Sequence, residues 1–181
     1  MTKTMNENKP LLFVDMDNVL ADFGAYVHEH FGAEPTYTGV ETKYDEIPGI
    51  FSKFKPVEGA VEALRILKEK YNIFILSTAP WNNPSAWADK LEWVKKYFSD
   101  IDGGDKDKED NDHPLLWKRL ILSHHKDLCF CQDAWLVDDC NDKNGAPTWY
   151  KNGKQLWFGH KEDEARAKDW PTVVDFLMNQ V

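Results

Sequence analysis

The sequence has few cysteines and no long hydrophobic run. Its three cysteines, Cys129, Cys131 and Cys140, are an odd number within twelve of the chain's 181 residues. This excludes the paired framework of a small disulfide-stapled protein. The first apolar run, residues 11–14, is too short for the hydrophobic part of a signal peptide or for a membrane span. We therefore expect a cytoplasmic protein that is neither exported nor embedded in a membrane.

Positive charge is also scarce. Lys and Arg total 22 against 31 Asp and Glu, which gives a formal net charge of −9. Such a surface repels phosphate backbones, so we expect no binding to DNA or RNA polymers. Hydrophobic residues make up 42% of the chain, enough to bury one core. The length suits one domain that carries at most a small insert.

Short apolar runs alternate with helical patterns along the chain. The runs, which are typical of strands buried on both faces, are residues 11–14, 72–77, 119–123 and 134–137. Apolar residues at helical spacing follow Gly59 and Ser85, the latter a candidate N-cap, and residues 170–178 predict a closing helix with Pro171 in its first turn. The sequence therefore predicts an α/β fold of Rossmann-like type, with a parallel sheet flanked by helices.

Three further segments complete the predicted organisation. Residues 18–69 are more than one crossover helix needs, so we interpret them as a small, mainly helical cap inserted after the first strand. Residues 1–17 and 70–181 then form the core domain. Asn152-Gly153 between two aromatic-rich runs predicts a β-hairpin near residues 148–158. The acidic stretch 100–112 lacks the glycine and the closing glutamate of an EF-hand, so we interpret it as a solvated loop.

Polar residues end several of the apolar runs. Parallel sheets bring the carboxyl ends of their strands to one edge, so these residues should meet in one crevice. They are Asp15, Asp17, Ser77, Thr78, Asp138 and Asp139. Four crowded carboxylates repel one another unless a divalent cation, a lysine or raised pKa values relieve the repulsion. A Mg²⁺ site is the simplest prediction.

The sequence Asp15-Met16-Asp17 suits phosphoryl transfer. The first carboxylate can attack phosphorus, while the second, two residues on, reaches the leaving group. A carboxyl beside other anions has a raised pKa, so Asp17 can protonate an alkoxide and then take a proton from the water that hydrolyses the aspartyl phosphate. These residues predict a phosphomonoesterase.

The transferred phosphate also needs hydrogen-bond donors. Ser77 and Thr78 follow a strand and offer hydroxyl groups and main-chain amides. Lys90, on the predicted helix after them, is the preferred lysine to complete the set. Lys118 and Lys126 remain alternatives, because spacing alone does not separate the three.

Four segments of the chain resemble, in order, the four motifs of the haloacid dehalogenase (HAD) superfamily, and within it those of the 5'(3')-deoxyribonucleotidases. The segments are residues 15–23 (DMDNVLADF), Ser77-Thr78, residues 89–98 around Lys90, and residues 136–139 (LVDD). The resemblance spans roughly residues 11–145. It implies a HAD-like fold, the cofactor Mg²⁺ and a (deoxy)nucleoside monophosphate as substrate.

The resemblance also assigns roles to individual residues. It implies that Asp15 is the nucleophile and that Asp17 is the acid/base, which also lends its main-chain carbonyl to the metal. Asp139 or its neighbour Asp138 would be the further metal ligand, so the implied metal set is Asp15, Asp17, Asp138 and Asp139. The residues implied to contact the substrate are Ser77, Thr78 and Lys90 at the phosphate and Phe23 at the base or sugar.

Two alternative functions remain open. Cys140 stands after the aspartate pair, where those nucleotidases often carry Arg, so a phosphatase of another small phosphate, such as a sugar phosphate, is the first alternative. A receiver-like phospho-acceptor module, which has similar residues in another motif order, is the second. We interpret the remaining candidate side chains as packing or loop residues rather than ligands; these are Trp81, Trp87, His124, His125, Cys129 and Cys131.

Overall fold

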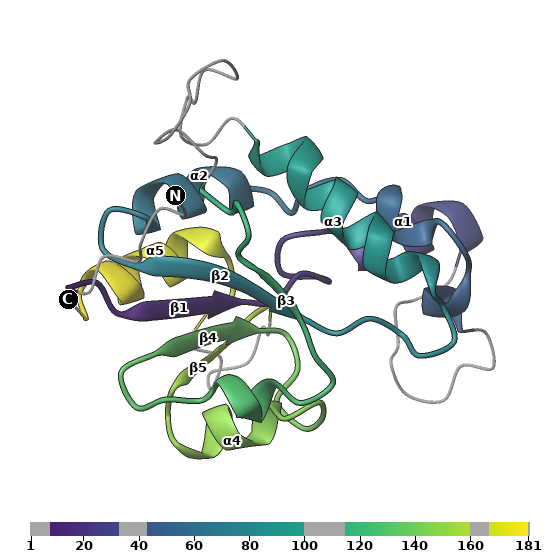
Figure 1. The fold of residues 1–181 in the computed structure, drawn as a ribbon. Helices are drawn as coiled ribbons and strands as arrows, with labels where there is room; N and C mark the ends of the chain where they lie inside the picture. The colour runs from purple at the N-terminus through teal and green to yellow at the C-terminus, as the bar shows by residue number, and fades with distance from the viewer. Residues whose placement is uncertain (1–7, 33–42, 100–114, 160–166, 181) are drawn as a thin grey trace.

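Five parallel strands form one sheet in the order β3-β2-β1-β4-β5 (Figure 1). The strands of this computed structural model, which describes residues 8–32, 43–99, 115–159 and 167–180, are β1 (Leu11–Val14), β2 (Asn72–Ser77), β3 (Leu120–Leu122), β4 (Trp135–Asp138) and β5 (Gln155–Trp157). The first strand lies in the middle and the chain winds outward from it in both directions, as in Rossmann-like folds. The predicted α/β fold is confirmed, and β1 to β4 lie where the apolar runs predict them.

Five helices and three short 3₁₀ turns connect these strands in the described part of the chain. They are α1 (Phe23–Phe31), η1 (Tyr44–Glu46), η2 (Ile50–Ser52), α2 (Ala60–Leu67), α3 (Ser85–Phe98), η3 (Lys126–Cys129), α4 (Ala146–Lys151) and α5 (Trp170–Met178). The helices predicted after Gly59 and Ser85 and the closing helix are confirmed, although Ser85 is the first residue of α3 and not its N-cap. Among the described helices, none has the length and apolar character needed to cross a membrane.

The two faces of the sheet bury two separate apolar clusters. Side chains alternate along a strand, so Leu12 and Val14 enter the larger cluster, whereas Phe13 enters the smaller one. Helices α2 and α5 pack against each other over the first face, and α4 covers the second face, where its Trp149 lies edge-on to Phe13 with ring centroids 5.5 Å apart (Figure 1). A sheet covered on both sides can present polar groups only at its strand ends.

The β-hairpin predicted near residues 148–158 is wrong. Residues 146–151 form α4, and β5 pairs in parallel with β4, with Leu136 opposite Gln155. Asn152 and Gly153 end the helix: their N–H groups bond to the carbonyls of Thr148 and Tyr150, and Gly153 has a φ of +66°. A glycine in the left-handed conformation suits a helix end as well as a hairpin. Burial of Trp149 favours the helix here.

The segment between β1 and α2 lies beyond the carboxyl ends of the strands, with α1 beside α3 (Figure 1). Its core is aromatic: Phe23 of α1 stacks on Phe51 of η2 at 6.3 Å and meets Phe54 edge-on at 5.2 Å between ring centroids. The cap boundaries at residues 18 and 69 stay a prediction; α2, inside that range, packs against α5 of the core. The acidic stretch 100–112 lies outside the described residues.

Candidate active site

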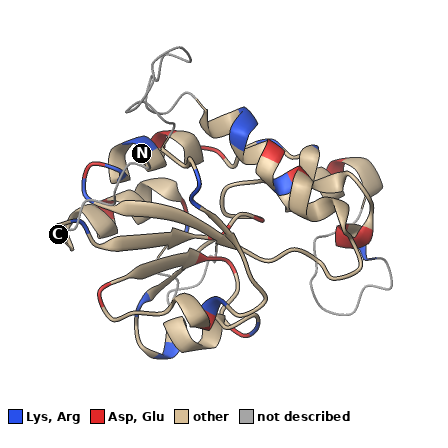
Figure 2. Cartoon of the chain, in the orientation of Figure 1, with Lys and Arg blue, Asp and Glu red and all other residues tan. Residues whose placement is uncertain are grey.

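The carboxyl ends of β1, β2 and β4 bring together the polar residues that the sequence places after its apolar runs. Asp15 follows β1 and its N–H bonds to the Val137 carbonyl of β4 at 2.8 Å, while Ser77 ends β2 and Asp138 ends β4. Figure 2 shows acidic residues at the ends of β1 and β4. Asp15 and Asp138 border a pocket of about 370 Å³ that is also lined by Asp17, Phe23, Phe51, Thr78, Lys126, Asp139, Cys140 and Trp157. The predicted crevice therefore exists.

Three of its carboxylates form a compact cluster. One carboxylate oxygen from each of Asp15, Asp138 and Asp139 lies within 4.8 Å of the others. Asp15 is 6% exposed and Asp138 is fully buried. The side chain of Asp17 stands beside this cluster and is bonded to Lys90. Carboxylate oxygens at this spacing are the donor set that hard divalent cations prefer.

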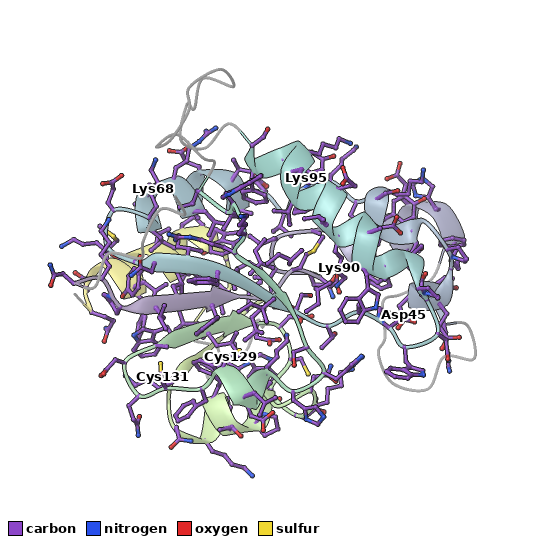
Figure 3. The ribbon with its side chains drawn as sticks, in the orientation of Figure 1. Asp45, Lys68, Lys90, Lys95, Cys129 and Cys131 are labelled. Carbon is purple, nitrogen blue, oxygen red and sulfur yellow. The ribbon has the colours of Figure 1, made fainter. Side chains whose placement is uncertain are left out.

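Two buried lysines enter the site. Lys126 Nζ, from η3, lies 3.0 Å from Asp15 Oδ1 and 2.6 Å from Asp138 Oδ2. Lys90 Nζ, from α3, donates to Asp17 Oδ2 and, at 3.0 Å, to Ser77 Oγ; Figure 3 shows this lysine between α3 and the end of the sheet. Lys118 lies elsewhere, in an apolar groove between α3 and β3. The sequence left Lys118 and Lys126 open beside the preferred Lys90, and the structure brings both Lys90 and Lys126 to the carboxylates.

Burial shapes the charge states of these groups. Burial and the nearby Asp15 carboxylate raise the pKa of Asp138 to about 7 and that of Asp139 to about 8. Burial also raises the pKa of Asp17, against the opposing effect of the Lys90 ammonium. For Lys126, burial acts to lower the pKa, but Asp15 and Asp138 outweigh it and raise the pKa. Without further positive charge nearby, these shifts favour the protonated forms of Asp138 and Asp139.

The residues fit a divalent cation. Four carboxylates face two ammonium groups, which leaves two formal negative charges, the charge that one divalent cation neutralises. Asp17 Oδ1 is buried and has no hydrogen-bond partner, and Asp15 Oδ1 has none besides its ion pair with Lys126, among the residues described. Buried carboxylate oxygens without such partners are costly in a folded protein unless something else binds them. The acidic cluster therefore suits a divalent metal.

Side chains of β5 hold the loop that carries Asp138 and Asp139. Trp157 Nε1 donates to the Asp139 carbonyl at 2.9 Å, and Gln155 Nε2 donates to the Cys140 carbonyl at 2.7 Å. The Cys140 N–H in turn donates to Asp138 Oδ1 at 2.9 Å. Sequence reasoning missed these contacts, because they depend on the parallel pairing of β5 with β4.

The 3₁₀ turn η3, which begins at Lys126, is also held by hydrogen bonds. The Lys126 N–H bonds to the Asn144 carbonyl at 2.8 Å, and Trp149 Nε1 donates to the Lys126 carbonyl at 3.0 Å. Gly145 has a φ of +83°, and a Cβ there would lie 2.3 Å from Asp127 Oδ1 and 2.7 Å from Lys126 N. Only glycine fits at position 145, because a Cβ there would collide with Lys126 and Asp127. This close approach of the Gly145 loop to the start of η3 helps to hold Lys126 in place.

The remaining residues named in the sequence analysis either line the pocket or lie outside it. Thr78 and Phe23 line the pocket, although Phe23 is only 8% exposed because Phe51 and Phe54 pack against it, and Cys140 lines it with its thiol donating to Asp142 Oδ1 at 3.1 Å. Trp81 is 86% exposed. The residues that lie outside this pocket are Trp81, Trp87, His124, His125, Cys129 and Cys131.

Comparison with known proteins finds similarity to 5'-nucleotidases over most of the chain. Residues 25–180 match the family described as 5' nucleotidase, deoxy (pyrimidine), cytosolic type C protein. A protein of Vibrio phage KVP40, named "Putative 5'(3')-deoxyribonucleotidase", is 38% identical over 181 residues, which cover 99% of this chain and 91% of that protein.

Other similar proteins match a smaller part of this chain or share less of its sequence. Proteins with the same type of name from Staphylococcus aureus (strain Mu50) and from Acanthamoeba polyphaga mimivirus are each 30% identical, over 49% and 48% of this chain and about half of their own lengths. A solved HAD family hydrolase from Deinococcus radiodurans R1, with bound phosphate and sodium, aligns at a TM-score of 0.44 and 12% identity, covering 94% of this chain and 88% of that one. The family match and the phage relative confirm the resemblance to the nucleotidases: the chain belongs to the 5'(3')-deoxyribonucleotidase-like family.

Proposed function

We propose that this protein is a Mg²⁺-dependent phosphomonoesterase that removes phosphate from (deoxy)nucleoside monophosphates through an aspartyl phosphate on Asp15. The observation that carries the proposal is the convergence of Asp15, Asp17, Asp138 and Asp139 on one pocket, with two buried lysines, Lys90 and Lys126, paired to these carboxylates. The family names of the relatives support the nucleotide as substrate class. The three free cysteines suit a reducing compartment, and we place the protein in the cytoplasm.

Asp15 is the proposed nucleophile. Its carboxylate attacks phosphorus, the bond from phosphorus to the nucleoside oxygen breaks, and the phosphoryl group is left on Asp15. The ion pair with Lys126 holds one carboxylate oxygen in place. Thr78 is the proposed donor to the phosphate, because it lines the pocket, whereas Ser77 is fully buried beside Lys90.

Asp17 is the proposed acid and base. Lys90 binds its Oδ2, which leaves the buried Oδ1 to carry a proton, and burial raises the pKa of this carboxyl so that it can hold one near neutral pH. Asp17 gives that proton to the departing nucleoside oxygen. It then takes a proton from the water that attacks the aspartyl phosphate, so that phosphate is released and both aspartates are restored.

The proposed ligands of Mg²⁺ are the side chains of Asp15 and Asp139 and the main-chain carbonyl of Asp17. Both oxygens of Asp138 already accept hydrogen bonds, from Lys126 and from the Cys140 N–H, so we assign Asp138 to holding Lys126. When bound, Mg²⁺ supplies positive charge that offsets the negative charge of the phosphate and of the carboxylates.

The test is phosphate release from a panel of nucleotides and sugar phosphates, with Mg²⁺ and with a chelator, by wild type and by Asp15→Asn. We expect release from nucleoside monophosphates that needs Mg²⁺, and no turnover by Asp15→Asn with the fold retained. Asn has the size of Asp without its nucleophilic charge. Faster release from sugar phosphates would favour the first alternative, which the absence of a cationic side chain at Cys140 keeps open. A phosphoprotein that persists for hours would favour a receiver-like module.

A further inference from the structure

Asn18 occupies a position where few side chains are tolerated. It follows Asp17 directly and has a φ of +59°, in the left-handed region that glycine adopts most easily. Its N–H bonds to the Ala21 carbonyl at 2.7 Å, which closes the turn after Asp17. Asparagine tolerates this conformation better than most residues, and unlike glycine it adds an amide group.

That amide joins two parts of the site. Asn18 Nδ2 donates to Asp139 Oδ2 at 3.0 Å, and Asn18 Oδ1 accepts from the Gly24 N–H of α1 at 2.9 Å. The Gly24 N–H fixes the orientation of the amide, because a main-chain N–H can only donate, so Oδ1 faces Gly24 and Nδ2 faces Asp139. Asn18 therefore bridges the Asp139 carboxylate and the first turn of α1.

From this bridge we infer that Asn18 is a positioning residue for the metal site, which aims the Asp139 carboxylate at the cation. The inference rests on the proposed function, because it assumes that Asp139 binds Mg²⁺. Trp157 holds the Asp139 carbonyl, and Asn18 holds the side chain itself. With the Trp157 and Asn18 contacts formed, one carboxylate oxygen of Asp139 lies within 4.8 Å of carboxylate oxygens of Asp15 and Asp138. Groups that orient metal ligands in this way strengthen metal binding.

The test variant is Asn18→Gly, which keeps the positive φ without strain and removes both amide contacts. The matched control is Asp22→Ala. Asp22 caps the same helix, with Oδ1 accepting from the Ala25 N–H at 2.9 Å, and it shows no contact with Asp139. Both variants weaken the start of α1, but only Asn18→Gly frees the Asp139 carboxylate to rotate.

The experiment measures Mg²⁺ binding by titration calorimetry on the substrate-free full chain, together with deoxynucleotide turnover across a Mg²⁺ series. We expect the Kd for Mg²⁺ to rise roughly ten- to a hundredfold in Asn18→Gly. The Kd of Asp22→Ala should stay within about twofold of wild type. At saturating Mg²⁺, kcat of Asn18→Gly should stay within a few-fold of wild type, which separates positioning of a metal ligand from loss of fold.

A Kd unchanged in Asn18→Gly, or an equal rise in Asp22→Ala, would overturn the inference. The proposed function fails in a different way: wild type that binds Mg²⁺ but releases no phosphate from any nucleotide overturns it. In that case a higher Kd for Mg²⁺ in Asn18→Gly than in wild type still supports the role of Asn18. Wild type that binds no Mg²⁺ overturns both.

Discussion

The two buried lysines stand in differently constructed halves of the site. The Lys126 half consists of Lys126, Asp15 and Asp138, and the Lys90 half consists of Lys90, Asp17 and Ser77. In the Lys126 half, one ammonium meets two carboxylates that are at most 6% exposed. In the Lys90 half, the lysine comes from α3, lies 4.6 Å from the centre of the Phe51 ring and meets a carboxylate whose side chain is 21% exposed.

This difference separates two physical tasks. The Lys126 half holds Asp15, the proposed nucleophile, at the centre of the sheet, where an unpaired charge would be very costly. The Lys90 half lies beside the aromatic residues of η2 and contacts Asp17, which the proposed mechanism requires to gain and lose a proton. Removing each lysine should therefore affect different properties.

The largest expected effect is that of Lys126→Met on stability. This change leaves Asp15 and Asp138 buried without their shared cation, and breaking a buried ion pair from one side costs about 3–5 kcal/mol of unfolding free energy. Chemical denaturation in EDTA at pH 8 measures it. The control is Lys118→Met, because Lys118 is exposed and lies in the apolar groove. Equal stability of the two variants would contradict the proposed importance of the Lys126 half.

Lys90→Met should cost less stability and should change the pH dependence of turnover. Asp17, whose side chain is partly exposed, loses one hydrogen-bonded partner, a loss of about 1–3 kcal/mol. The Lys90 ammonium lowers the pKa of Asp17, so its removal raises that pKa further. Since the acid must be protonated to act, the pH above which kcat falls should move upward. A pH–rate profile tests this, and a profile that moves downward or not at all would contradict the assignment of Asp17.

The smallest expected effect is a pH dependence of stability without metal. The aspartates of the unfolded chain titrate near 3.8, whereas Asp138 and Asp139 in the folded chain titrate at about 7 and about 8. Between these values the folded state binds more protons, so its free energy of unfolding falls as the pH rises. Thermal unfolding in EDTA should show Tm decreasing from about pH 6 to about pH 8, and saturating Mg²⁺ should reverse the decrease.

Asp139→Asn is the control for that dependence, because it removes one of the two carboxyls that titrate in this range. The slope of Tm against pH in EDTA should be shallower in this variant. A wild-type Tm that rises with pH in EDTA would show that these carboxyls are not protonated in the folded chain.

The sheet and three of its strand-end residues follow directly from the sequence. Runs such as residues 72–77 are mostly apolar because β-strands buried on both faces tolerate little else, and the residue that ends each run is polar because it faces the polar site at the carboxyl edge of the sheet. Asp15, Ser77 and Asp138 could therefore be placed at one edge before any coordinates. The same reasoning applied to the strand at 120–122 points to the loop after it, which holds Lys126.

Other features depend on contacts that local sequence does not encode. Asn152-Gly153 carries the same turn signal in a hairpin and at a helix end, and only the burial of Trp149 decides between them. The β5 strand has three residues, too few for a periodic pattern. Its position beside β4, and so the role of Trp157 at the Asp139 carbonyl, was not predictable from spacing.

The contribution of β5 has a consequence for how the protein is made. Asp15, the proposed nucleophile, follows the strand of this sheet that is synthesised first, whereas the indole that holds the Asp139 carbonyl belongs to the strand synthesised last. A nascent chain that ends before residue 155 therefore contains all four aspartates but lacks the strand that secures their loop. The proposed activity should therefore appear only after β5 has been synthesised.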